Sequence, residues 1–119
     1  MSAGLEYGTV QKKTIIGSGQ SQSGQIQSQQ STLVAILMPL AWDAASVTIE
    51  VCMDGTNFYP LYDKTGAEYV VTVAAGRFVF LDPVALLGAK QIKLRSGTAA
   101  LPVTQTANRE IVAVFRPLY

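Results

Sequence analysis

The sequence predicts an all-β protein, an antiparallel, jelly-roll-like β-sandwich with an extended N-terminal arm. Segments in which apolar and polar residues alternate, such as residues 47–53 (VTIEVCM), recur along the chain, and this period of two is typical of strands with one buried face. Turn-forming residues separate these segments at intervals of roughly 8–12 residues, the spacing found in antiparallel sandwiches and barrels.

The N-terminal part of the chain divides into an arm and a polar segment. Residues 1–13 have mixed polarity and no sustained periodicity, so we expect them to form the arm and residues 14–119 to form one sandwich domain. The Gln- and Ser-rich stretch that follows is either a linker or part of the fold. We favour short extended segments at 14–17 and 24–29, because an edge strand needs only backbone partners and polar side chains protect it from aggregation.

Further segments complete the predicted sandwich. After an apolar run from Leu33 to Met38, they are residues 47–53, 58–61, 67–73, 77–81, 91–95 and 110–116. An Asp54–Gly55 turn joins the first two, since glycine tolerates a positive φ. Asp82 followed by Pro83 predicts a short helical turn, because Asp is a favoured N-cap and Pro a favoured first helical residue.

The alternation within each strand also predicts which residues face the core. In each of these strands we assign one set of alternate residues to the interior. The predicted core residues are Ile49, Val51, Phe78, Phe80, Ile92, Leu94, Val112 and Val114.

The composition is apolar and poor in charge, with 49% hydrophobic and 14% charged residues. Such a surface suits contact with a partner, although an ordinary small β domain remains the alternative. The net charge is +1, and no run of like charges is longer than Lys12–Lys13, which argues against a nucleic-acid partner. No apolar run is long enough for a bilayer span or a secretion signal, so we expect no membrane partner and synthesis in the cytoplasm.

The sequence offers little for catalysis or metal binding. It contains no histidine, the commonest general base and metal ligand, and Cys52, the single cysteine, is expected to be a buried, inert thiol. Asp43, Asp54, Asp63 and Asp82 each stand where Asp caps a turn or a helix, a stronger explanation than a calcium cluster. We therefore expect no enzyme activity, no cofactor and no metal site.

Aromatic residues leave one binding alternative open. A sugar-stacking platform needs exposed, coplanar rings, but Phe58 and Tyr59 point to opposite faces of their strand, and Trp42 is expected to lie in the core. Carbohydrate binding is kept as the minor alternative. The candidate residues are Trp42, Phe58, Tyr59, Tyr62 and Tyr69.

Several local motifs resemble those of a known group of proteins. They are an M-P-x-x-W corner (Met38, Pro39, Trp42), the Asp54–Gly55 turn, L-D-P at 81–83, K-L-R-S-G-T at 93–98, and Gln105 and Arg109 before the last strand. With these motifs, residues 14–118 resemble small β-sandwich structural proteins of tailed bacteriophages, of the capsid decoration (cement) type. Strand structure before the corner is expected from this group, whereas Cys52 departs from its pattern.

The resemblance implies a viral structural protein located on the virion. We expect a capsid decoration protein that binds and stabilises the outer surface of the phage head, with the major capsid protein as partner and a homotrimer as the favoured homo-oligomer. The predicted capsid contacts are the arm residues Tyr7, Val10, Lys12 and Lys13. A neck, head-fibre or tail-associated component, or a carbohydrate- or host-surface-binding module, remain the alternatives.

Overall fold

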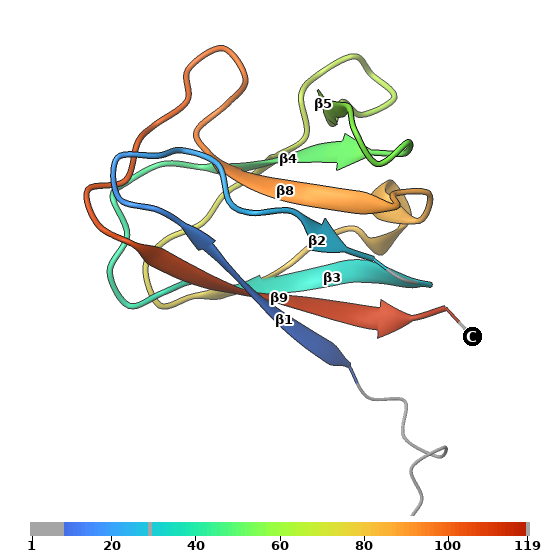
Figure 1. Ribbon diagram of the computed structural model, residues 1–119, viewed down its shortest axis with the longest axis horizontal. Helices are drawn as coiled ribbons and strands as arrows, with labels where there is room; N and C mark the ends of the chain where they lie inside the picture. Colours follow the sequence, from blue (N-terminus) through green and yellow to red (C-terminus); the bar gives the residue numbers. More distant parts are fainter. Residues whose placement is uncertain (1–8, 29, 119) are drawn as a thin grey trace, which may run out of the picture.

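The structure is a computed structural model that describes residues 9–28 and 30–118, and these residues form two packed antiparallel β-sheets (Figure 1). The first sheet has the strand order β1-β9-β3-β7. Its strands are β1 (Val10–Ile16), β9 (Arg109–Pro117), β3 (Ser31–Leu37) and β7 (Phe78–Phe80). The second sheet has the order β2-β8-β4-β5, with β6 also paired to β4. Its strands are β2 (Ile26–Gln27), β8 (Gln91–Ser96), β4 (Val47–Cys52), β5 (Phe58–Pro60) and β6 (Val70–Val71).

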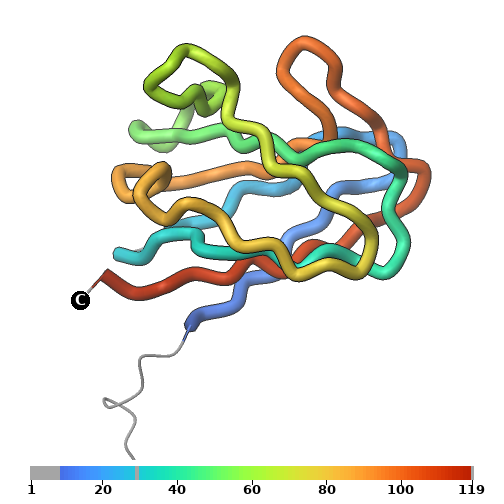
Figure 2. The backbone as a smooth tube through the Cα atoms, turned by 180° about the vertical axis from the view of Figure 1, so that it is seen from behind, coloured from blue at the N-terminus to red at the C-terminus, as the bar shows by residue number. Residues whose placement is uncertain are grey.

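The strand order is that of a jelly roll, so the predicted fold class is confirmed. Leaving aside the two-residue β6, the first strand pairs with the last, β2 with β8, β3 with β7, and β4 with β5. This is the pattern of one long antiparallel hairpin rolled into two sheets. Figure 2 shows the two layers from behind, with the chain crossing repeatedly between them.

The core lies between the two sheets and is made mostly of aliphatic side chains. Ile49, Ile92 and Leu94 are completely buried there, as predicted, and Val51 is partly buried against them. Their strands, β4 and β8, alternate cleanly between apolar and polar residues, which is why the sequence identified their inward faces. The other fully buried large side chains include Phe115, Ile16, Leu33, Ile36, Leu86 and Ile111.

The predicted orientation of β7 is wrong. Phe78 and Phe80 are 62% and 83% exposed, while Val79 between them packs against the core. Residue size suggested that the two phenylalanines face inward. Because all three residues of β7 are apolar, the alternation carries no information about which face is buried.

The predicted orientation of β9 is also wrong. Ile111, Ala113 and Phe115 contribute to the core, whereas Val112 and Val114 point to the opposite side of the sheet. Val114 is nevertheless buried and Val112 partly buried. The inward set contains an alanine, so the outward valines form the more uniformly β-branched set and misled the assignment.

The polar N-terminal segment belongs to the fold, as favoured above. Its Ile26–Gln27 portion forms β2, and Ser23 makes a backbone hydrogen bond of 2.8 Å to Leu94. The predicted boundary between arm and domain needs correction, because β1 begins at Val10 and pairs along its length with β9. Residues 10–13 are therefore part of the sandwich, and residues 1–8 of the predicted arm lie outside the described residues.

The predicted turn and helix signals are confirmed. Gly55 has φ of +85° in the β4–β5 turn, and Asp54 accepts hydrogen bonds from the backbone of Thr56 and Asn57. A 3-10 helix, η2 (Pro83–Leu86), begins after Asp82, whose carboxylate accepts a 3.0 Å hydrogen bond from Val84 N–H. Cys52 is completely buried, as expected.

Gln105 and Arg109 fix the corner that follows Trp42. The Gln105 side chain is 1% exposed, accepts a hydrogen bond from Asp43 N–H and donates one to Ser96 Oγ. Arg109 pairs with the Asp43 carboxylate at 2.8 Å. These two motif residues join the corner after Trp42 to the end of β8 and the start of β9, which is a structural role. Trp42 is partly buried against the core.

Candidate interaction surface

The side of the first sheet that faces away from the core is a candidate contact surface. Cross-strand pairing places its outward side chains in two central rows, flanked by one pair at each end. One row is Phe78, Leu37, Val112 and Lys13, and the other is Phe80, Ala35, Val114 and Gln11. The end pairs are Ile15–Glu110 and Thr32–Arg116. We call these twelve residues the outer face.

The outer face is mainly apolar, and its largest apolar side chains are exposed to solvent. Phe80 is 83% exposed, Phe78 62%, Ile15 50% and Leu37 41%. An antiparallel sheet with one solvated face normally carries polar residues on that face. Figure 1 shows no described segment lying across the lower, outer side of β1, β9 and β3. Ala35 and Val114, between these side chains, are 3% and 6% exposed. A gathering of exposed apolar side chains on one sheet face marks a contact site more often than a chance surface.

A shallow hollow extends the outer face beyond the end of β3. It has a volume of about 310 Å³, and Leu37 and Val112 form part of its wall together with Pro39, Leu40 and Gly76. Leu40 is 91% exposed. The apolar surface therefore continues around the corner where the chain leaves β3.

Charged groups of both signs border the apolar rows. Glu110 and Arg116 are exposed at opposite ends of the outward side of β9, and Lys13 is exposed on β1. The ion pairs found among the described residues lie elsewhere, between Arg95 and two glutamates and between Arg109 and Asp43.

The structure separates the predicted arm contacts. Tyr7 lies outside the described residues. Val10 is 44% exposed at the start of β1, and Lys13 points to the outer face. Lys12 points to the opposite side, where its ammonium lies 5.2 Å from the Phe115 ring centre and donates a hydrogen bond to the Gln27 carbonyl. Because adjacent strand residues face opposite sides, Lys12 and Lys13 do not form one basic site.

The acidic residues considered as a calcium cluster act in local turns. Hydrogen bonds from the backbone N–H groups of Asn57 and Thr56 hold the pKa of Asp54 well below its usual value. The Thr65 hydroxyl and backbone lower the pKa of Asp63. No group of three or more potential metal ligands occurs within residues 9–28 and 30–118.

Asp43 differs from these turn residues because it pairs with a cation. Loss of water contact raises the pKa of Asp43, but hydrogen bonds from Thr106 and Arg109 outweigh this effect. The net result is a pKa below the ordinary aspartate value. All three shifts keep these carboxylates ionised near neutral pH, as expected for groups that cap turns and pair with arginine.

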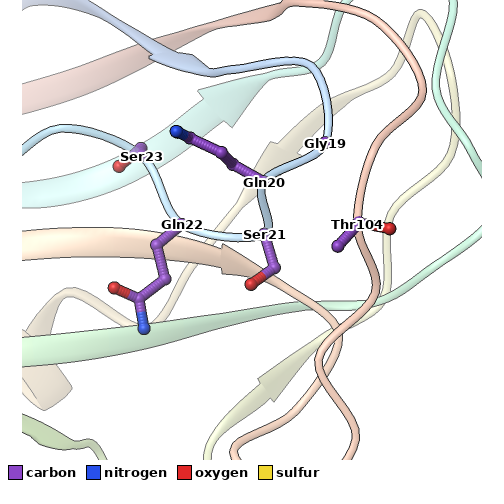
Figure 3. Close-up of a pocket in the computed structure, with 6 residues that line it drawn as sticks. All are labelled: Gly19, Gln20, Ser21, Gln22, Ser23 and Thr104. Carbon is purple, nitrogen blue, oxygen red and sulfur yellow. The ribbon is translucent and has the colours of Figure 1, made fainter.

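A polar hollow beside the Gln- and Ser-rich loop lacks the residue types of a catalytic site. It measures about 440 Å³, and its wall contains only Gly, Ser, Thr and Gln residues, none of which titrates near neutral pH. Figure 3 shows the side chains of Gln20 and Gln22 extending in different directions. Without convergent polar groups, this hollow offers no constellation for acid–base or nucleophilic chemistry.

Two adjoining hollows carry the exposed tyrosines. Tyr62 is 54% exposed and lies between them, with Tyr59 in the wall of the first and Asp63 and Asp82 in that of the second. Their volumes are about 410 and 360 Å³. Sequence reasoning named both tyrosines, whereas the outer face was missed because its phenylalanines were assigned to the core.

No family model matches the chain, and no curated protein or solved structure is significantly similar to it. Among the described residues, none belongs to a helix with the length and apolarity needed to cross a bilayer.

Proposed function

We propose that this protein is a capsid decoration protein, which binds the outer surface of a phage head and stabilises it. The observation that carries the proposal is the apolar outer face on a charge-poor jelly roll. Such a face is better suited to stable contact with other protein subunits than to exposure to water on a monomer. The resemblance of the sequence motifs to those of small phage structural proteins also supports the proposal.

The fold adds a weaker argument. Jelly rolls build viral capsid domains as well as lectin domains, but a fold hosts many functions and does not specify one. A decoration protein would act as a homo-oligomer on the major capsid protein, where many weak contacts per particle add through avidity. A neck, head-fibre or tail-associated role would use the same surface chemistry at fewer positions.

Binding to undecorated heads tests this proposal. Purified protein is titrated onto heads that lack it, and bound copies are counted per major capsid protein. We expect saturation at a fixed ratio set by the capsid lattice, and a measurable rise in the temperature at which the heads open. Absence of binding, or binding confined to a single vertex, would contradict a decoration role.

Glycan binding is a second candidate, favoured by one observation. The exposed ring of Tyr62 lies next to Asp63 and Asp82 in one hollow, and an aromatic ring beside carboxylates is a chemistry that recognises sugars through stacking and hydroxyl hydrogen bonds. A glycan array probed with the wild type and with Tyr62→Ala tests it. Glycan binding that the substitution abolishes would favour this candidate over decoration.

A further inference from the structure

We propose that the outer face is the contact between two copies of this chain, which stack face to face around a two-fold axis. The axis runs in the plane of the interface, perpendicular to the strands, over the row Lys12–Ala113–Ile36–Val79 that separates the two central rows. This pairing goes beyond the proposed capsid role and does not depend on it.

The order of residues along β9 provides the first argument. Glu110 stands at one end of the outward side of β9 and Arg116 at the other, about 20 Å apart for six strand residues. The two-fold axis reverses the strand direction in the second copy. Each Glu110 then faces an Arg116 of the partner copy, which gives two symmetric pairs of opposite charge and no like-charge contact at these ends.

The shapes of the two central rows provide the second argument. The same axis places each row opposite the other row of the partner copy. Leu37 then faces the small Ala35, Val112 faces Val114, and Phe78 faces Phe80. One pair sets a large residue against a small one and the other two are equal in size, so apolar side chains meet apolar side chains along both rows, as in the core of a sandwich whose sheets lie about 10 Å apart.

The size of the outer face provides the third argument. Twelve outward positions, spaced about 4.8 Å between strands and about 7 Å along them, cover roughly 400 Å² in projection. Accessible area exceeds this projection, because Phe78 and Phe80 stand out from the sheet with 62% and 83% of their surface exposed. A stable interface buries about 800 Å² of accessible surface per partner, about twice this projected area, so the protruding side chains must supply the remainder.

Three-fold assembly, which the sequence favoured, fits this face less well. A ring of three copies joins two different patches of each chain. The outer face instead carries complementary charges and matching apolar rows on one patch, related by a single two-fold rotation, which is the property of an isologous contact.

Sedimentation equilibrium of the full chain, without capsids, tests the pairing. We expect a dimer whose Kd rises by about tenfold or more in Phe80→Lys, because a lysine that faces the partner copy must lose its water on association. Leu101→Lys is the matched control, since Leu101 is 76% exposed on a loop outside the outer face, and its Kd should equal that of the wild type. The melting temperatures are measured at protein concentrations below the Kd. Equal values for the variants show that a higher Kd does not result from unfolding.

A charge exchange makes the test specific for the two-fold arrangement. Glu110→Lys and Arg116→Glu should each raise the Kd severalfold, and the double variant should return it to near the wild-type value. A double variant that associates no better than the single ones would overturn the proposed geometry. A trimer, or a monomer at all concentrations, would overturn the pairing itself.

Other occupants of the outer face give different results. If residues 1–8 cover it, the wild type is monomeric and their deletion creates the association. If the capsid covers it, the wild type is monomeric and Phe80→Lys weakens head binding. Either result contradicts the pairing, whereas a dimer that fails to bind heads contradicts the capsid role alone.

Discussion

The guanidinium of Arg95 lies 2.8 Å from the carboxylate of Glu50, and these side chains are 5% and 12% exposed. A buried ion pair is stable only when further hydrogen bonds offset the loss of water. Arg95 has them: it also pairs with Glu68 at 2.9 Å and donates to Thr48 Oγ1 at 3.0 Å. This cluster joins β4 and β8 to the loop that carries Glu68.

Removing the arginine should therefore be costly. Arg95→Leu leaves two carboxylates with little water and no cation, and we expect the free energy of unfolding to fall by about 3–5 kcal/mol. Urea denaturation measures it. Arg77→Leu, at an exposed arginine, serves as the control and should change stability by less than about 0.5 kcal/mol. A loss below about 1 kcal/mol for Arg95→Leu would show that the cluster contributes little.

The corrected strand orientations make a second prediction. Phe115 is completely buried, so Phe115→Ala should lower the free energy of unfolding by about 3–5 kcal/mol. Phe80 is exposed, so Phe80→Ala should change it by less than about 1 kcal/mol in dilute, monomeric protein. Comparable losses in the two variants would mean that the outer face is packed within one chain.

The sandwich was predictable from the sequence. The inward faces of β4 and β8 were predicted correctly and those of β7 and β9 were not, for a physical reason. In β4 and β8 the residues opposite the core are Thr48, Glu50, Lys93 and Arg95, so the polar side identifies the apolar one. In β7 both sides are apolar, and periodicity then cannot tell a core face from a contact face. In β9 the charged Glu110 and Arg116 mark the outward side, but the two valines between them were assigned to the core. A strand that has a core face on one side and a contact face on the other carries apolar residues on both sides.

Side-chain contacts between residues far apart in the chain also could not be predicted from the sequence. Asp43 is separated from Arg109 by 66 residues, and Glu68 from Arg95 by 27. Each of these residues looks like an ordinary turn or surface residue in its local context. Only the rolled topology brings them together, and no local pattern of period or propensity encodes such pairs.

Acid should weaken the fold through its turn aspartates. The pKa values of Asp43, Asp54 and Asp63 are lowered in the folded state, so their stabilising effect is present above the unfolded-state value of about 3.9 and is lost as pH falls through the lower folded-state values. We expect stability measured by denaturation to be level from pH 7 to about 5 and to decline below about 4. In Asp54→Asn the decline should be shallower.

The N-terminal arm should act in attachment, with its boundary before β1. Deleting residues 1–8 leaves β1 complete, so the melting temperature should be unchanged while binding to undecorated heads weakens. Deleting residues 1–13 also removes Val10 to Lys13 and their pairing with β9, so the melting temperature should fall. Full occupancy of heads by the variant that lacks residues 1–8 would show that these residues do not anchor the protein.

The ratio of this chain to the major capsid protein in purified particles tests the decoration role most directly. Quantitative mass spectrometry of intact virions, calibrated with labelled peptides of both proteins, gives this ratio. A decoration protein predicts a simple ratio repeated across the whole capsid lattice. A count that matches one ring at a single vertex, or absence of the chain from the particle, would contradict it.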